Sequence, residues 1–93
     1  MKNRTITKEQ LRELEGLAYW IADKNYIIER YGVNDPEVDR CHKTIILIFD
    51  KLDELETPFL IQNMVICWAE NWRNYKEQYT RNYLKGRGVT VAG

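Results

Sequence analysis

Two short breaks divide most of this 93-residue chain into three long segments with helical periodicity. The first break, residues 32–35, precedes Pro36, and the second, residues 56–57, precedes Pro58. Proline is favoured at the first position of a helix, and an Asp or Thr before it can cap that helix. Connections this short place successive helices side by side in opposite directions. The breaks therefore predict an all-α protein, a three-helix up-down-up bundle.

The predicted helices cover about residues 8–31, 36–55 and 58–85 of a single domain, residues 1–93, with a loose tail at 86–93. Thr7 and Gln10 have the spacing of a capping box at the start of the first helix. Gly32 can adopt the left-handed conformation that ends a helix, and Asp35 and Thr57 are the predicted caps of the next two. The apolar run 44–49 is predicted to be helical rather than a strand, because helical spacing continues on both sides.

Gly16 lies inside the first predicted helix, where glycine costs about 1 kcal/mol relative to alanine. Two explanations remain open at this point. Either another backbone approaches the helix closely at Gly16, or the helix is simply weakened there.

The charge balance argues against a protein whose whole surface binds nucleic acid. Lys and Arg together number 14, as do Asp and Glu, so the formal net charge is zero. The charges are unevenly spread: residues 34–56 carry seven acidic and three basic groups, whereas residues 57–93 carry two acidic and five basic groups. Patterns of this kind usually reflect solvated faces with complementary neighbours.

Cys41 lies on the apolar stripe of the second predicted helix, and Cys67 stands among apolar neighbours. The N-terminal segment lacks the apolar core of a signal peptide, and no run is long enough to span a bilayer. We expect a cytoplasmic protein with buried free thiols and no disulfide.

The third predicted helix carries a stripe of aromatic residues spaced by three or four positions: Trp68, Trp72, Tyr75, Tyr79 and Tyr83. This spacing keeps the rings on one side of a helix. The first helix is expected to end, and the second to begin, opposite about residue 77, so the last two turns of the third should overhang the bundle. The overhang combines tyrosines and cations, which are enriched at protein interfaces. The predicted partner-binding residues are Tyr79, Arg81, Asn82, Tyr83, Leu84, Lys85 and Arg87.

Catalytic and metal-binding patterns are weak in this sequence. Cys41 and His42 are adjacent, but neighbours in a helix point about 100° apart and do not suit a nucleophile and its base. The carboxylates at 50–56 are interleaved with Lys51, which favours a solvated helix end over a metal site. We predict no catalytic residue, no metal and no cofactor, and hence no enzyme.

The resulting hypothesis is a small adaptor, regulator or inhibitor that binds another protein. Compact helical proteins without catalytic motifs are common among phage and mobile-element (viral) regulators, and a homodimer or larger homo-oligomer is expected. The alternative is a nucleic-acid-associated regulator that uses the basic, aromatic end of the third helix. No contact with a membrane is predicted.

Overall fold

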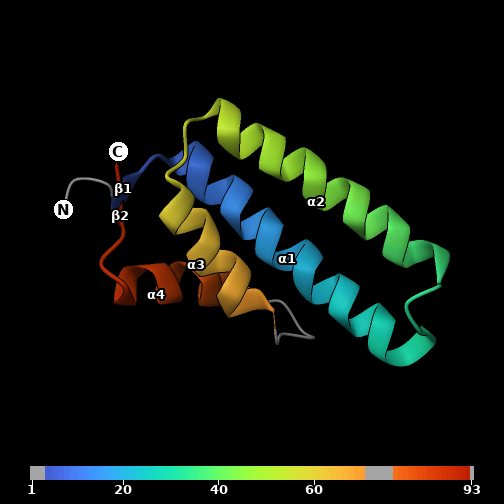
Figure 1. Ribbon diagram of the computed structural model, residues 1–93. Helices are drawn as coiled ribbons and strands as arrows, with labels where there is room; N and C mark the ends of the chain where they lie inside the picture. The colour runs from blue at the N-terminus through green and yellow to red at the C-terminus, as the bar shows by residue number, and fades with distance from the viewer. Residues whose placement is uncertain (1–3, 71–76, 93) are drawn as a thin grey trace.

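In a computed structural model that describes residues 4–70 and 77–92, the chain forms a bundle of helices with two very short strands at one end (Figure 1). The helices are α1 (Lys8–Tyr31), α2 (Pro36–Glu54), α3 (Phe59–Ala69) and α4 (Glu77–Gly86), and the strands are β1 (Thr5–Ile6) and β2 (Thr90–Val91). The all-α prediction is confirmed, and residues 44–49 lie inside α2 as predicted.

The start of α1 is fixed by the capping box that the sequence predicts. The Thr7 hydroxyl accepts from the backbone N–H of Gln10 at 3.0 Å, and the Gln10 side-chain oxygen accepts from the Thr7 N–H at 2.7 Å. The Nε2 group of the same amide donates to the carbonyl of Leu55 at 2.8 Å. Gln10 therefore starts α1 and also joins it to the end of α2.

The connection between α1 and α2 also follows the prediction. Gly32 has a φ of +92°, in the region that favours glycine. The Asp35 carboxylate accepts from the backbone N–H of Glu37 at 2.9 Å, and Pro36 is the first residue of α2. This arrangement satisfies an otherwise unpaired N–H at the helix start.

The end of α2 is a Schellman motif, and it overturns the predicted role of Thr57. The backbone N–H of Thr57 donates to the carbonyl of Leu52, and that of Glu56 donates to Asp53, both at 3.0 Å. Glu56 adopts a φ of +57°. The prediction that Thr57 caps the next helix is wrong, because no side chain caps α3 and the buried Thr57 hydroxyl has no hydrogen-bond partner among the described residues. Thr57 serves the end of α2 through its backbone instead.

The prediction of a single third helix over residues 58–85 is wrong, because the chain turns back within that range. α3 ends at Ala69, and α4 begins at Glu77. Trp68 and Tyr83 stack with ring centroids 5.0 Å apart and planes 18° apart. A straight helix would separate positions 68 and 83 by about 22 Å. The two halves of the expected helix therefore lie beside each other.

A side chain of α1 marks the end of α3. The Asn25 amide donates to the carbonyl of Ala69 at 3.3 Å and to that of Glu70 at 2.6 Å. These carbonyls belong to the last turn of a helix, where the backbone acceptors lack intrahelical partners. Asn25, which interrupts the apolar stripe of α1, thus stabilises the point at which α3 stops.

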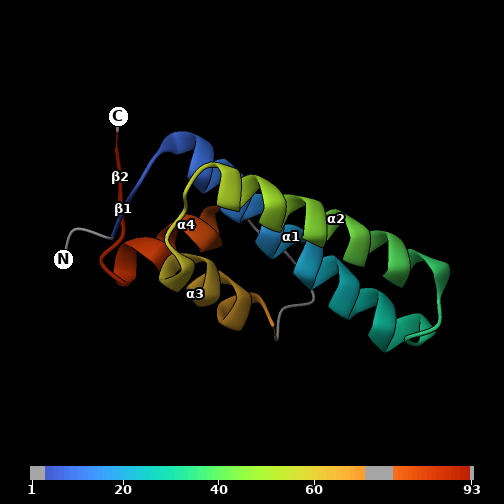
Figure 2. The same cartoon turned by 45° about the horizontal axis from the view of Figure 1, so that its top comes forward.

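The helix α1 is the centre of the packing. α2 lies along most of its length, α4 packs against its N-terminal half, and α3 packs beside it as far as Asn25 (Figures 1 and 2). The predicted overhang of a third helix is therefore wrong. The end of the hairpin formed by α1 and α2 extends beyond the other helices instead, held by a small apolar cluster of Ile27, Val38 and Cys41.

The main core lies where all the helices meet. Its fully buried members include Leu14 and Leu17 of α1, Leu52 of α2, and Ile61 and Val65 of α3. Apolar burial is the main favourable term in folding, so this end of the molecule should contribute most of the stability.

The prediction of a loose tail is wrong for the residues that the structure describes. β2 pairs in parallel with β1, with Thr90 opposite Thr5, and the Ala92 N–H donates to the carbonyl of Ile6 at 2.7 Å. α4 ends in a second Schellman motif, in which Gly88 has a φ of +83° and the Val89 N–H donates to the carbonyl of Leu84. Val89 and Leu84 are both buried in the main core, so the tail is anchored before it reaches β1.

Substitution of Gly16 by alanine should stabilise the protein. A Cβ at Gly16 would meet the Ile48 side chain at 3.7 Å, which is ordinary van der Waals contact, so no close backbone approach requires glycine. We expect Gly16→Ala to raise the free energy of unfolding by about 0.5–1 kcal/mol, measured by urea denaturation. Gly88→Ala is the control, because its positive φ should make it destabilising. A destabilised Gly16→Ala variant would contradict the interpretation.

Substitution of Glu56 by glycine should also be stabilising. Glu56 has a left-handed backbone conformation and places a negative charge next to the C-terminus of α2. Glycine removes both the backbone strain and the unfavourable charge. We expect Glu56→Gly to raise the free energy of unfolding by about 1 kcal/mol, measured by thermal and urea unfolding. Glu56→Ala removes only the charge, so it should recover a smaller part of this gain. An equal gain in both variants would show that strain contributes nothing.

Candidate functional site

A groove lies between the first half of α1, α4 and the C-terminal tail. It consists of two adjoining cavities of about 350 and 440 Å³, which share Leu11, Arg81 and Val91 in their walls. Three separate segments form it: Lys8, Leu11, Arg12 and Glu15 from α1, Arg81, Leu84 and Lys85 from α4, and Val89, Thr90 and Val91 from the tail. The return of α4 alongside α1 is what creates this groove.

The floor of the groove is aliphatic. Leu84 is buried, Leu11 is half-buried, and Val91 is 38 % exposed. Val89 belongs to the main core and supports the tail from below. The floor therefore rests on packed residues while still offering apolar surface to a ligand, which is typical of binding sites.

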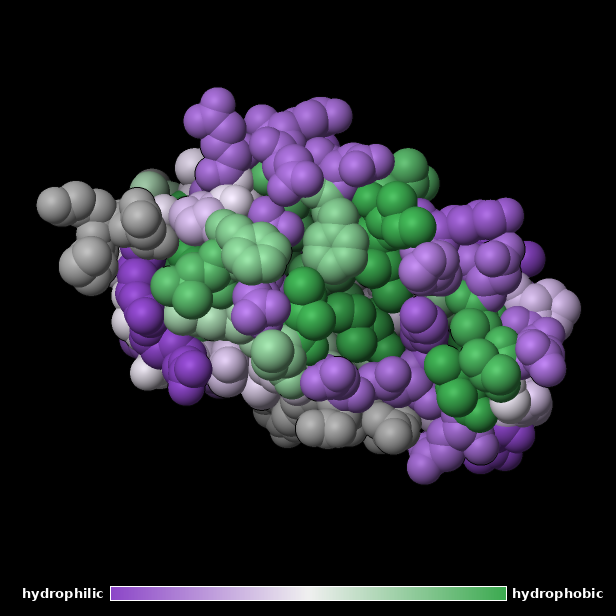
Figure 3. Space-filling view, in the orientation of Figure 1, coloured by the Kyte–Doolittle hydropathy of each residue, from purple (hydrophilic) through white to green (hydrophobic). Residues whose placement is uncertain are grey.

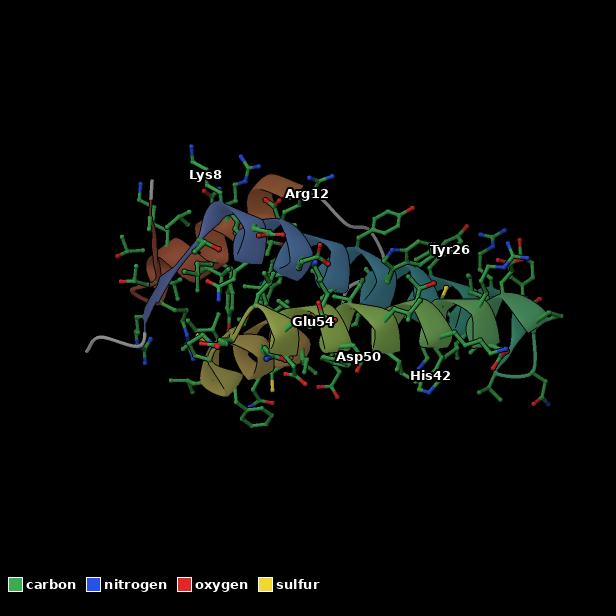
Figure 4. The ribbon with its side chains drawn as sticks, turned by 90° about the horizontal axis from the view of Figure 1, so that it is seen from above. Lys8, Arg12, Tyr26, His42, Asp50 and Glu54 are labelled. Carbon is green, nitrogen blue, oxygen red and sulfur yellow. The ribbon has the colours of Figure 1, made fainter. Side chains whose placement is uncertain are left out.

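The rim of the groove carries four cations. Lys8 and Arg12 lie one turn apart on α1, at the edge of the molecule next to α4 (Figure 4), and Arg81 and Lys85 lie one turn apart on α4. Lys8, Arg12 and Lys85 are exposed, and none of them has an ion pair or hydrogen bond to a residue within 4–70 or 77–92. The groove thus presents unneutralised positive charge around an apolar floor.

The acidic residue of the groove is already paired. The Glu15 carboxylate accepts from Arg81 Nε at 2.5 Å, and the two side chains are 10 % and 56 % exposed. A carboxylate so well buried needs a partner, because a charge taken out of water without one is costly. Arg81 therefore joins α4 to α1, and Glu15 contributes little negative charge to the groove.

The predicted site residues divide between the groove and the packing around it. Arg81, Leu84 and Lys85 line the groove, although Leu84 is buried and not exposed as predicted. Tyr83 stacks on Trp68, and the Arg87 guanidinium lies 5.7 Å from the ring centroid of Tyr83.

The remaining predicted residues lie outside the groove walls. The backbone carbonyl of Arg87 accepts a hydrogen bond from Arg4. Asn82 is exposed on α4. Tyr79 belongs to α4, but its side chain lies outside the described part of the protein, as do Trp72 and Tyr75 of the predicted stripe.

Sequence reasoning missed the contribution of α1 to this site. Lys8, Leu11, Arg12 and Glu15 follow one another at helical spacing, so their shared face could have been found from the sequence. Their pairing with α4 could not, because the predicted third helix ran away from that end of α1.

The two cysteines differ in environment. Cys41 is buried, and its Sγ lies 3.7 Å from a carboxylate oxygen of Asp23. Burial, the negative charge of Asp23 and its hydrogen bond with the thiol raise the pKa of Cys41 above its ordinary value. Cys67 is exposed on α3, so the prediction that both thiols are buried is wrong for this residue.

Neither a metal site nor a membrane-spanning helix is found within residues 4–70 and 77–92. No group of three or more His, Cys, Asp or Glu side chains within 4–70 and 77–92 is placed to hold a metal ion. No helix in this part of the chain is long and apolar enough to cross a bilayer.

The chain matches no protein-family model, no curated protein and no solved structure.

The contrast between the thiols leads to a labelling prediction. Iodoacetamide should modify Cys67 in the native protein and reach Cys41 only after unfolding, because the reactive species is the thiolate and Cys41 is both buried and held in its neutral form. Mass spectrometry of native and denatured samples measures the adducts. A Cys67→Ser variant should take up no label natively, and rapid native labelling of that variant would contradict the burial of Cys41.

Proposed function

We propose that this protein is a small helical interaction module that acts as an adaptor, regulator or inhibitor by binding an acidic, amphipathic segment of another protein in the groove. The observation that carries this proposal is the combination of an aliphatic floor with four cations on the rim. The partner's apolar side chains would fill the floor, and its carboxylates would pair with Lys8, Arg12 and Lys85.

The two parts of the groove contribute differently to binding. Burial of apolar side chains on Leu11 and Val91 would supply most of the affinity, because exposed ion pairs are individually worth little. The cations would speed association with an acidic segment and disfavour a basic one. This division explains how a small groove can select its partner.

The second candidate, nucleic-acid binding, is favoured by the same four cations. Phosphate groups pair with Lys and Arg, and exposed aromatic rings would be needed for bases to stack. Apart from Thr90, the described residues that line the groove are aliphatic or charged, and none of them is aromatic. Tyr83 and Trp68 are stacked on each other instead. A protein ligand therefore fits the groove better.

Pull-downs from the cell that makes the protein can test the proposal with single variants of the groove. Leu11→Asp places a charge on the aliphatic floor, and Lys85→Glu reverses a charge on the rim. Each should lower recovery of the partner by at least about tenfold, because one removes apolar contact and the other repels an acidic ligand.

Two substitutions of similar chemistry outside the groove serve as controls. Val33→Asp lies in the connection between α1 and α2 at an exposed position, and Arg30→Glu lies at the far end of α1. Both should leave recovery unchanged. Binding that survives Leu11→Asp but collapses steeply with salt would favour nucleic acid over a protein partner.

A further inference from the structure

The outer face of α2 is an exposed helical stripe with an apolar centre. Ile46 is 45 % exposed and Leu47 is 66 % exposed, and both lie near the middle of the helix. Figure 3 shows hydrophobic residues over the middle of α2, with hydrophilic residues on either side along the helix. The exposed residues of this face are Asp39, Arg40, Lys43, Ile46, Leu47, Asp50, Asp53 and Glu54.

The charges on this face are arranged unsymmetrically about its centre. The cations Arg40 and Lys43 precede Ile46, whereas the carboxylates Asp50 and Glu54 follow Leu47. Lys43 and Asp50 stand at nearly equal distances on either side of the apolar pair, two helical turns apart. A helix face with this order is complementary to an identical face turned end to end.

We propose that two copies of this protein pair through α2, antiparallel, about a two-fold axis that passes between Ile46 and Leu47. Each apolar residue then lies beside its own equivalent across the axis. Lys43 faces Asp50 of the second copy, and Arg40 faces Glu54 of the second copy. Because the axis is two-fold, each ion pair occurs twice, as in any isologous interface.

The state of these charges in the single chain supports the pairing. Asp50 has no ion pair or hydrogen bond to any residue among those described, and it lies one turn from Glu54, a like charge. Lys43 pairs with Asp39 at 3.1 Å, but both side chains are about two-thirds exposed or more, so that pair is weak. A cation from a second copy would relieve the repulsion between Asp50 and Glu54.

One contact opposes the arrangement. Asp39 would lie near Asp53 of the second copy, at the edge of the interface. Both side chains are exposed, so water and salt would screen this repulsion. Because a single helix face also buries less than the roughly 1,600 Å² of a standard stable interface, the pairing should be reversible and concentration-dependent.

The paired face is distinct from the groove. In Figure 4, Asp50 lies at the edge of the molecule along α2, whereas Lys8 and Arg12 lie at the opposite edge next to α4. Self-association through α2 would therefore leave both grooves open.

Sedimentation equilibrium between about 10 µM and 1 mM can test the pairing through charge reversal. The wild-type protein should show a mass that rises with concentration. Lys43→Glu and Asp50→Lys should each weaken association by at least about tenfold, because like charges would then face each other twice.

Mixing the two variants provides the sharper test. In the mixed pair, the native Asp50 of the Lys43→Glu chain faces the native Lys43 of the Asp50→Lys chain. The two substituted positions also face each other with opposite charges. An equimolar mixture should therefore recover association, and so should a chain that carries both substitutions.

Leu47→Asp tests the apolar centre, with Val33→Asp as a control of matched exposure outside this face. Leu47→Asp should leave a folded monomer, verified by circular dichroism, whereas Val33→Asp should associate like the wild type. The pairing is overturned if the wild type stays monomeric throughout, if Leu47→Asp associates normally, or if the mixture of charge variants remains monomeric.

Discussion

The rest of the structure depends on where α3 ends, and the hydrogen bonds from Asn25 to the carbonyls of Ala69 and Glu70 mark that point. They lie where α3 stops, at Ala69, and the chain beyond returns as α4 alongside α3 and the N-terminal half of α1. That return stacks Tyr83 on Trp68 and brings Arg81 to the buried Glu15. If α4 instead continued away from the bundle, Glu15 would lack its cation and the groove would have only one wall.

Sequence reasoning predicted the features that local chemistry determines. The capping box of α1, the turn at Gly32 and the start of α2 at Pro36 each involve residues within a few positions of one another. It failed at the end of α3, because the helical spacing of aromatic residues continues through the break. The side chain that meets this helix end, Asn25, lies 44 positions earlier than Ala69 on another helix, and no local pattern connects the two.

Because the end of α3 was not predicted, only part of the candidate site could be found from the sequence. Arg81 and Lys85 were identified from their composition and position, and both line the groove. Leu84 was expected on an exposed overhang, and it is buried because α4 packs onto the core. Lys8, Leu11 and Arg12 were missed because their importance depends on which helix lies opposite them. Residue types indicate what a surface can bind, but the tertiary arrangement decides which residues share that surface.

Pairing through the outer face of α2 would bring two grooves into one assembly. They lie at opposite edges of the molecule, so two copies joined through α2 would present two open grooves related by the two-fold axis. A partner with two acidic segments, or two partners held together, could then occupy both grooves at once. The second binding event would be intramolecular, and its effective concentration can raise the overall affinity well above that of one groove. Weak self-association would in this way make partner binding depend on the concentration of the protein itself.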